Sequence, residues 1–189
     1  MRGNKAVILK EMDADVTLNN GVSMPVVGFG LFKVHAAEMP VAVEAAVDAG
    51  YRLYDTAQVY KNERHLADAL KLAFEKPKTS IDHLSFRHKC REDVFITSKL
   101  HPRNQNYEAA KRAVTESLEQ LETEFIDLYL IHWPGTSKLK PEDPMNAENR
   151  RTSWEALEEA YKNEKSVRGE EEGDTVNSLC RRQLGHSYF

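Results

Sequence analysis

The chain has 189 residues, of which 41% are hydrophobic, and it carries a formal net charge of −4. This length suits about one domain that can bury a core of its own. Lys and Arg are scattered among Asp and Glu, so the sequence offers no basic patch for nucleic acid and no cationic surface for an anionic membrane. We therefore expect neither of those partners.

The cysteine content and the absence of long apolar runs indicate the compartment. Cys90 and Cys180 are far apart in polar surroundings. They form no metal-binding spacing and no disulfide framework, which is typical of a reducing environment. No apolar run has the length of a signal peptide or a membrane span. We expect a cytoplasmic protein that binds no metal.

The first predicted element is a β-hairpin. Residues 1–15 show no clear period, and we expect them to be frayed. Asn20-Gly21 lies between the two short apolar stretches of Val16–Met24. That pair predicts a two-residue hairpin turn, because both residues tolerate positive φ. Val26–Phe32 then predicts a short buried strand that ends in a glycine-bearing loop.

Strands and helices alternate along the rest of the chain. Further strands are predicted at Tyr51–Asp55, Val94–Leu100 and Phe125–Ile131. A helix is predicted at Glu38–Ala49, with Ala42, Ala45, Ala46 and Ala49 on one face and Gly50 at its end, and a second helix after a capping Asn62, with a stripe of Leu66, Ala69, Leu70 and Ala73. Two more helices are predicted, one at Tyr107–Leu121 and one after a capping Ser153. The polar segment Lys78–Arg91 predicts a surface loop. Alternating βα units indicate a parallel sheet covered by helices.

Two fold classes fit this order, a doubly wound open sheet and a (β/α) barrel. A nucleotide-binding open sheet usually carries a GxGxxG motif after its first strand. Here only Gly28-Phe29-Gly30 is present, which is a weak signal alone. The pattern therefore favours an α/β barrel, of which this chain contains the hairpin and about the first four βα units.

Four chemically active residues lie at or just after the predicted strand ends. Asp55 ends the second strand, Tyr60 lies in the loop after it, Lys99 is near the end of the third, and His132 comes directly after the fourth. In a βα barrel, the chemistry takes place at the carboxyl ends of the strands. Since side chains alternate along a strand, Lys99 and His132 continue the rows that otherwise fill the barrel.

Each of these residues also has an ordinary structural explanation. Asp55 could form a turn, Tyr60 could cover a loop, Lys99 could extend from a strand end to water, and His132 could be a hydrogen-bonded core histidine. Three successive strands that each place an ionisable residue at the same end are harder to explain in this way. We therefore interpret the four residues as one site.

The four side chains are chemically complementary. A tyrosine hydroxyl with a pKa near 10 is a weak acid–base catalyst at neutral pH. We expect the ammonium of Lys99, held by Asp55, to lower the pKa of Tyr60. A neutral His132 could donate a hydrogen bond to a carbonyl oxygen. Such a site would protonate an oxygen while hydride reaches the carbon, and since no side chain supplies hydride, a nicotinamide cofactor is implied.

Four blocks of the sequence resemble the aldo-keto reductases. They are MPVVGFGLFK, DAGYRLYDTAQVYKNE, VFITSKL and FIDLYLIHWPG, in this order and with similar spacing, and the resemblance runs from Val16 to Lys162. The resemblance implies a (β/α)8 barrel (a TIM barrel) whose bottom is closed by an N-terminal hairpin. It also implies reduction of aldehydes and ketones with NADPH.

The resemblance also implies a role for each site residue. Tyr60 would be the proton donor, Lys99 and Asp55 would tune it, and His132 would orient the substrate carbonyl. Phe32 and Trp133, together with His132, would line the substrate pocket. The first cofactor contacts would be Gly30, Leu31, Phe32 and Asp55. An aromatic pocket of this kind favours small aldehydes and aromatic or aliphatic ketones over charged sugars.

The chain departs from the family pattern in three places. Leu31 stands where the family more often has a small threonine, and Lys78–Arg91 is longer than usual. From Ser166 onward the resemblance ends, and the remaining 24 residues are too few for the later strands. We therefore divide the chain into a frayed 1–15, a partial barrel at 16–165 and a divergent polar tail at 166–189.

The sequence leaves three hypotheses for the function. The first is an NADPH-dependent reductase, with cofactor binding weakened because the contacts of the later strands are missing. The second is a truncated, catalytically inactive isoform that acts, if at all, by association with another protein or with itself through open sheet edges. The third, a binding module of another βα fold, would require the four-residue coincidence to be accidental.

Overall fold

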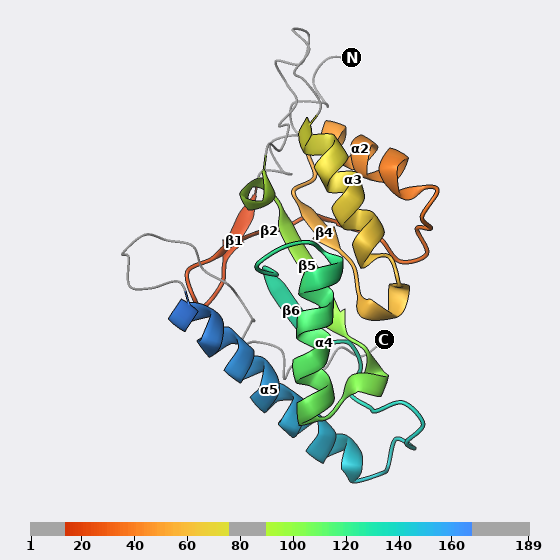
Figure 1. Ribbon diagram of the computed structural model, residues 1–189, viewed down its shortest axis with the longest axis vertical. Coiled ribbons are helices and arrows are strands. Elements are labelled where there is room, and N and C mark those ends of the chain that lie inside the picture. Colours follow the sequence, from red (N-terminus) through yellow and green to blue (C-terminus); the bar gives the residue numbers. More distant parts are fainter. Residues whose placement is uncertain (1–13, 76–89, 168–189) are drawn as a thin grey trace, which may run out of the picture.

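Parallel strands and helices alternate through most of the computed structural model, which describes residues 14–75 and 90–167, with backbone alone at 164–167 (Figure 1). The strands are β1 (Asp15–Thr17), β2 (Ser23–Pro25), β3 (Gly28–Gly30), β4 (Leu53–Asp55), β5 (Phe95–Leu100) and β6 (Leu128–Ile131). The helices are α2 (Met39–Ala49), α3 (Glu63–Glu75), α4 (Tyr107–Gln120) and α5 (Met145–Val167), with 3-10 turns η1 (Gln58–Tyr60), η2 (Arg91–Asp93) and η3 (Pro102–Asn104).

The predicted N-terminal hairpin is confirmed, but its turn is longer than expected. β1 and β2 pair antiparallel, and Leu18 and Val22 extend the ladder with a backbone hydrogen bond of 2.8 Å. The loop therefore has three residues, of which Gly21 has a φ of +87°. Its N–H donates to the carbonyl of Leu18, which is the pattern of a turn that ends in a left-handed glycine. The expected two-residue turn was wrong for this reason.

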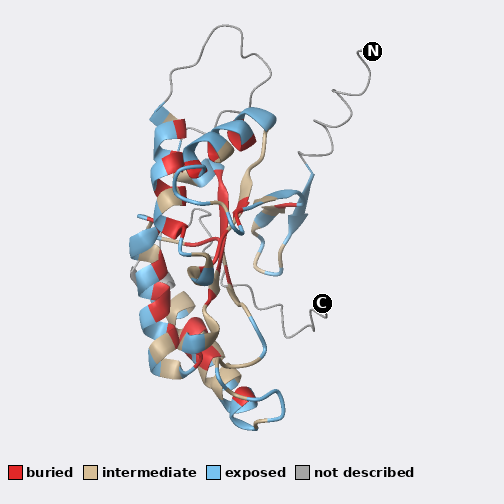
Figure 2. Cartoon of the chain, turned by 90° about the vertical axis from the view of Figure 1, so that its right-hand side faces the viewer, coloured by how far each residue is buried: buried red, intermediate tan, exposed pale blue. Residues whose placement is uncertain are grey.

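The main sheet has four parallel strands in the order β3-β4-β5-β6. Consecutive strands are neighbours throughout, whereas a doubly wound sheet reverses its order at a switch point. The helices gather on one side of this sheet and the β1–β2 hairpin lies on the other (Figure 2). This α/β arrangement confirms the expected first units of a barrel, in which helices cover only the outer face.

The core lies between the sheet and the helices. Leu66, Ala69, Leu70 and Ala73 of α3 are all buried, as the predicted stripe requires. In α2 the predicted alanine face was wrong, because the buried residues are Met39, Val43, Ala46 and Val47. The larger side chains bury more apolar surface, so they turn the helix by about one position. Gly50 ends α2 with a φ of +90°, as expected for its position.

The last helix begins earlier than predicted. Ser153 is not its N-cap but a buried residue within α5, and its hydroxyl donates to the carbonyl of Asn149 at 2.7 Å. The helix begins at Met145, whose N–H donates to Asp143 Oδ1 at 2.9 Å. Arg151 pairs with Glu148 at 2.6 Å and also with Glu155. These ion pairs stabilise the first turns of α5, whose polar sequence otherwise resembles that of a loop.

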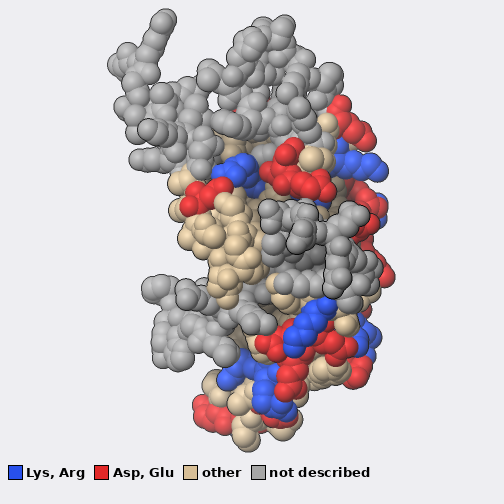
Figure 3. All heavy atoms as spheres, turned by 90° about the vertical axis from the view of Figure 1, so that its left-hand side faces the viewer, with Lys and Arg blue, Asp and Glu red and all other residues tan. Residues whose placement is uncertain are grey.

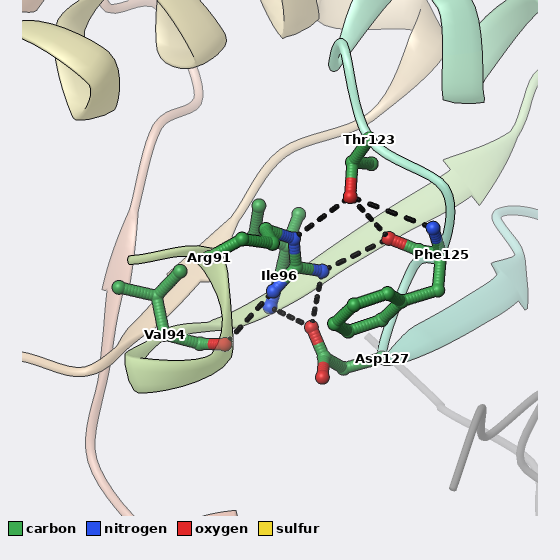
Figure 4. A network of polar contacts seen from close by, with 6 residues as sticks. All are labelled: Arg91, Val94, Ile96, Thr123, Phe125 and Asp127. Atoms are coloured by element: carbon green, nitrogen blue, oxygen red, sulfur yellow. Dashed lines mark hydrogen bonds and ion pairs between the residues drawn. The ribbon is translucent and has the colours of Figure 1, made fainter. Parts of the chain in front are cut away.

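A partly buried cluster around Arg91 joins the amino ends of β5 and β6 (Figure 4). The guanidinium nitrogens of Arg91 donate to Thr123 Oγ1 at 3.1 Å, the Val94 carbonyl at 2.9 Å, the Phe125 carbonyl at 3.0 Å and Asp127 Oδ2 at 2.6 Å. The same oxygen of Asp127 accepts the N–H of Ile96 at 2.8 Å. Burial raises the pKa of Asp127, although Arg91 acts in the opposite direction. The cluster fixes β6 beside β5 and so helps to place the loops at the carboxyl ends of both strands.

Several predicted segments lie largely outside the described residues. The frayed N-terminus, most of the loop at Lys78–Arg91 and nearly all of the divergent tail belong to them. Within the described ranges, no helix is both long and apolar enough to cross a membrane. On the face in Figure 3, positive and negative side chains of the described residues are interspersed.

Candidate active site

The four residues singled out by the sequence come together at the carboxyl edge of the sheet. Asp55 is the last residue of β4, and Tyr60 is the last residue of the short turn η1 after that strand. Lys99 lies next to the end of β5, and His132 comes directly after β6. Because β4, β5 and β6 are parallel neighbours, their carboxyl ends meet at one edge.

Lys99 and Asp55 form an ion pair across β4 and β5. The Nζ atom of Lys99 lies 2.5 Å from Asp55 Oδ1 and donates a second hydrogen bond to the Thr56 carbonyl at 2.9 Å. The lysine side chain is only 13% exposed, whereas that of Asp55 is 35% exposed. This lysine therefore does not extend into water, and the structural explanation that the sequence left open for Lys99 does not hold.

The ring of Tyr60 lies between the lysine and two other rings. Lys99 Nζ is 5.2 Å from its centroid, and the ring of His132 meets it edge-on at 5.6 Å. Phe32 packs on it at a centroid distance of 5.1 Å. The site therefore places a phenol, an ammonium and an imidazole around one point above the sheet.

The expected lowering of the pKa of Tyr60 is wrong for this structure. Burial raises the pKa of its hydroxyl, and the carboxylate of Asp55 raises it further. The charge of Lys99 is balanced by Asp55 at 2.5 Å, so the tyrosine is next to an ion pair rather than a free cation. The hydroxyl is consequently protonated at neutral pH, as a proton donor must be before it acts.

His132 is held in its neutral form. Burial lowers its pKa and the ammonium of Lys99 lowers it further, against the smaller opposite effect of Asp55. Its Nδ1 atom is buried and has no hydrogen-bond partner in the part of the chain that the structure describes. Its backbone N–H donates to the carbonyl of Leu100 at 3.3 Å, which continues the β5–β6 ladder. A neutral imidazole can donate one hydrogen bond from a ring nitrogen.

Two exposed aromatic rings border the site. Phe32 is 63% exposed and Trp133 is 54% exposed. The indole of Trp133 stacks on His132, with an interplanar angle of 12° and centroids 6.1 Å apart. Together they provide an apolar rim beside the site.

The predicted cofactor contacts differ in how accessible they are. Gly30 is exposed, and a Cβ atom there would meet nothing within 4 Å, so open space borders this backbone. Leu31 is 0% exposed and belongs to the core, so its predicted cofactor contact has no accessible atom here. Its backbone N–H donates to the Asp55 carbonyl at 2.9 Å, which fixes the loop instead. A large apolar residue turns inward where a small hydroxyl residue could face a ligand.

The side chain of Asn62 has a role that the sequence analysis missed. Its carbonyl accepts the N–H of Leu66, as for a residue before a helix, but its amide does not cap that helix. Nδ2 donates to the carbonyls of Leu31 and Val34 at 2.9 and 3.0 Å, and Oδ1 accepts the hydroxyl of Thr56 at 2.7 Å. In the sequence, Asn62 is a polar residue between a predicted strand and a predicted helix. That position is equally typical of a helix-capping residue, so the sequence did not indicate these contacts.

A buried carboxylate lies behind the site, on the helix side of the sheet. Glu63 is 6% exposed and accepts the hydroxyl of Ser98, the neighbour of Lys99, at 2.6 Å. Burial raises the pKa of Glu63, with hydrogen bonds from Ser98 and Ser117 acting against it. This pair ties the start of α3 to β5 directly beneath the lysine. Sequence periodicity gave no signal for it.

No group of three or more His, Cys, Asp or Glu among the described residues could hold a metal ion. The polar atoms of the site are instead those of an acid–base centre: one hydroxyl, one ammonium, one carboxylate and one imidazole. This set can donate a proton to an oxygen and stabilise the charge that remains.

Comparisons with known proteins agree with this geometry. A family model described as the aldo/keto reductase family matches residues 27–166. The chain is 40% identical over 151 residues to glyoxal reductase of Bacillus subtilis (strain 168), which covers 79% of this chain and 46% of that protein. It is 38% identical over 154 residues to 9,11-endoperoxide prostaglandin H2 reductase of Trypanosoma cruzi (strain CL Brener), covering 81% of this chain and 45% of that protein.

Solved structures give the same result. The crystal structure of an aldo/keto reductase from Brucella melitensis superimposes with a TM-score of 0.63 at 32% identity, covering 79% of this chain and 48% of that one. This chain thus spans about half the length of the relatives and of the solved structure it matches.

Proposed function

This chain belongs to the aldo-keto reductase family, and from that premise we propose that it reduces aldehydes or ketones to alcohols with NADPH. The observation that carries the proposal is the grouping of Tyr60, the Lys99–Asp55 pair and His132 at one edge of the sheet. The ordinary structural explanations, an exposed lysine, a core histidine or a tyrosine covering a loop, each account for one residue alone. None of them explains why the four side chains lie together.

In the proposed reaction Tyr60 donates its hydroxyl proton to the carbonyl oxygen of the substrate. Its raised pKa keeps that proton in place until the oxygen gains negative charge. The phenolate that remains is stabilised by the ammonium of Lys99, whose Nζ lies 5.2 Å from the ring centroid. Asp55 keeps the ammonium beneath the ring. The nicotinamide, when bound, supplies hydride to the carbonyl carbon.

His132 orients the substrate carbonyl. We assign the donated hydrogen bond to Nε2, because Nδ1 is buried on the protein side. A neutral imidazole also does not compete with Tyr60 as the acid, and the lowered pKa of His132 keeps it neutral. The result is one proton donor and one hydrogen-bond donor on the same oxygen.

The residues present fit the nicotinamide end of the cofactor in part. The open space beside Gly30 and the partly exposed carboxylate of Asp55 can receive polar groups near Tyr60. Leu31 adds no accessible atom. We therefore propose a cofactor site with few contacts from this part of the chain and correspondingly weak binding of NADPH.

The apolar rim supports a substrate class. Phe32 and Trp133 expose ring surface on either side of Tyr60 and His132. Such surfaces favour small aldehydes and aromatic or aliphatic ketones over charged sugars. We also propose a cytoplasmic location, which rests on the cysteine usage of the sequence.

Two measurements on the full chain test this proposal. Titration with NADPH should change the cofactor fluorescence, with an affinity weaker than micromolar. Adding a generic aromatic aldehyde should then consume NADPH and form the alcohol in equal amounts. A chain that gives neither a fluorescence change nor alcohol at millimolar NADPH would contradict the assignment.

A second candidate function is association through sheet edges. Among the described residues, β3 and β6 each have a neighbouring strand on one side only. Unpaired edge strands form hydrogen bonds with other chains. We propose that such association, with a second copy of this chain, is the alternative if the chain is inactive.

A further inference from the structure

The element that carries Tyr60 has little structure of its own. The turn η1 contains three residues and is followed by Lys61, which has a left-handed φ of +56°. The N–H of Tyr60 donates to the carbonyl of Ala57 at 2.9 Å, which is a bond within the turn itself. So short a turn does not fix the tyrosine ring by itself, and its position must depend on contacts from elsewhere.

One of these contacts is the side-chain amide of Gln58. Its Oε1 accepts the N–H of His101 at 3.0 Å and Nδ2 of Asn104 at 3.4 Å, while its Nε2 donates to the Ala113 carbonyl at 2.8 Å. An N–H on one side and a carbonyl on the other allow only one orientation of the amide. Gln58 therefore fastens the Tyr60 turn to the segment between β5 and α4, which we call the β5–α4 segment (101–106).

The loop that carries His132 and Trp133 is fastened to the same segment by a second glutamine. Gln105 is 1% exposed. Its Nε2 donates to the carbonyl of Trp133 at 2.5 Å, and its Oε1 accepts the hydroxyl of Thr136 at 3.0 Å. Again a carbonyl and a hydroxyl occupy the two ends of the amide.

The two amides have a shared consequence. Tyr60 comes after β4 and Trp133 after β6, so their loops are separated in the sheet by β5. The β5–α4 segment lies between them and begins only two residues after Lys99. We propose that Gln58 and Gln105 are positioning residues: Gln58 sets Tyr60, and Gln105 sets His132 and Trp133, each relative to Lys99.

This inference deepens the proposed function, on which its catalytic part rests, but its structural part needs no turnover. The full chain is labelled with 3-fluorotyrosine, and the Tyr60 resonance is assigned with Tyr60→Phe. A second sample carries 5-fluorotryptophan, whose two resonances are assigned with Trp133→Phe, since the chain has two tryptophans. The variants are Gln58→Met and Gln105→Met, which keep side-chain length and remove the amide.

The expected result is a crossed pattern. Gln58→Met shifts or broadens the fluorine resonance of Tyr60 more than that of Trp133, and Gln105→Met does the reverse, with a smaller effect on Tyr60 through the ring of His132. Gln58→Glu retains the acceptor for His101, so its Tyr60 resonance lies between those of the unsubstituted chain and Gln58→Met. If both variants move both resonances alike, or neither moves either, the proposal is overturned.

The kinetic arm separates this inference from the proposed function. If the chain reduces an aldehyde, Gln58→Met lowers kcat by up to about a hundredfold, because a small misplacement of a catalytic group is costly. KM changes less, and Gln58→Glu recovers part of kcat. If the chain is inactive, the crossed resonances still support the positioning roles while the proposed function fails. A kcat unchanged in Gln58→Met would overturn the catalytic part even where the resonances cross.

Discussion

The Nζ atom of Lys99 lies 2.5 Å from Oδ1 of Asp55, across two parallel strands that meet at the same edge. The lysine is 13% exposed, so its ammonium has exchanged most of its water for this carboxylate and one backbone carbonyl. A charge of this kind is costly to bury without a partner. The ammonium of Lys99 lies 5.2 Å from the centroid of the Tyr60 ring, where it can stabilise a phenolate.

Replacing Lys99 with methionine should lower the reductase rate at neutral pH by about 10²–10⁴-fold. The stem is kept and the charge removed, so the phenolate formed from Tyr60 loses its only nearby cation among the residues that the structure places around its ring. The pKa of Tyr60, already raised by burial and Asp55, should rise further. The measurement is the pH–rate profile with a generic aldehyde.

The control for this variant is Lys61→Met, which removes an exposed lysine from the same loop. It should keep nearly the full rate, since the ammonium that the structure places over the ring of Tyr60 is that of Lys99. An unchanged profile in Lys99→Met would assign that lysine a structural role alone.

Glu63→Gln should change how stability depends on pH. Burial raises the pKa of Glu63 in the folded chain, so protonation of Glu63 stabilises the fold below its unfolded pKa near 4.3, and that stabilisation is lost as pH rises through the folded pKa. Glutamine keeps the volume and the acceptor for Ser98 but has no charge to desolvate. The free energy of unfolding of the variant minus that of the unsubstituted chain should therefore increase as pH rises from about 4 to 7.

Urea unfolding at several pH values measures this difference. Glu75→Gln, at the exposed end of the same helix, is the matched control and should change the free energy of unfolding by less than about 0.5 kcal/mol. A constant difference between Glu63→Gln and the unsubstituted chain across that range would show that Glu63 does not titrate differently in the fold.

Arg91→Met should destabilise the fold by about 3–5 kcal/mol, because it leaves the buried carboxylate of Asp127 without its cation. The two side chains are 17% and 12% exposed, and they join β5 to β6 (Figure 4). Adding Asp127→Leu should recover part of the loss, since the second change removes the buried carboxylate itself. Denaturant unfolding measures both variants.

The same substitution at an exposed ion pair is the control. Arg64 pairs with Glu122 at 2.9 Å, but the side chains are 50% and 40% exposed. Arg64→Met should therefore cost less than about 1 kcal/mol. Equal losses at the two arginines would contradict the interpretation of Arg91 as a partly buried connection between strands.

The sequence predicted the site better than its supports. Tyr60, Lys99 and His132 could be located because strand ends in a parallel sheet meet at one edge, so residue type and position were enough. Gln58 and Gln105 could not, because each binds backbone atoms of a distant segment, and such contacts leave no periodic pattern. The role of a side chain in a loop depends on what folds against it.

The errors in the predicted fold have similar physical causes. Ser153 is a good capping residue in isolation, but the ion pairs of Arg151 extend the helix past it. Leu31 was assigned to the cofactor by its place in a motif, whereas its size and apolarity carry it into the core. In both places tertiary contacts outweigh a local preference.

The purified chain should associate rather than remain a monomer. In the described part of the sheet, β3 and β6 are edge strands, and parallel edges without a partner pair with other chains. Leu128→Lys, on β6, places a charge on such an edge and should reduce association. Val41→Lys adds the same charge on an exposed part of α2, at a residue that is 71% exposed, and should have no effect. Light scattering coupled to size-exclusion chromatography measures the mass; a monodisperse monomer would contradict this expectation.

Transfer of a deuterium label shows whether Tyr60 delivers the proton while a nicotinamide delivers hydride. The full chain is incubated with an aromatic aldehyde and millimolar NADPH that carries deuterium at the transferable position. We expect an alcohol with one deuterium on its carbinol carbon, and almost none of it from Tyr60→Phe, which loses only the hydroxyl and should unfold at a similar temperature. Labelled alcohol formed at the same rate by Tyr60→Phe, or by neither protein, would refute this division of roles.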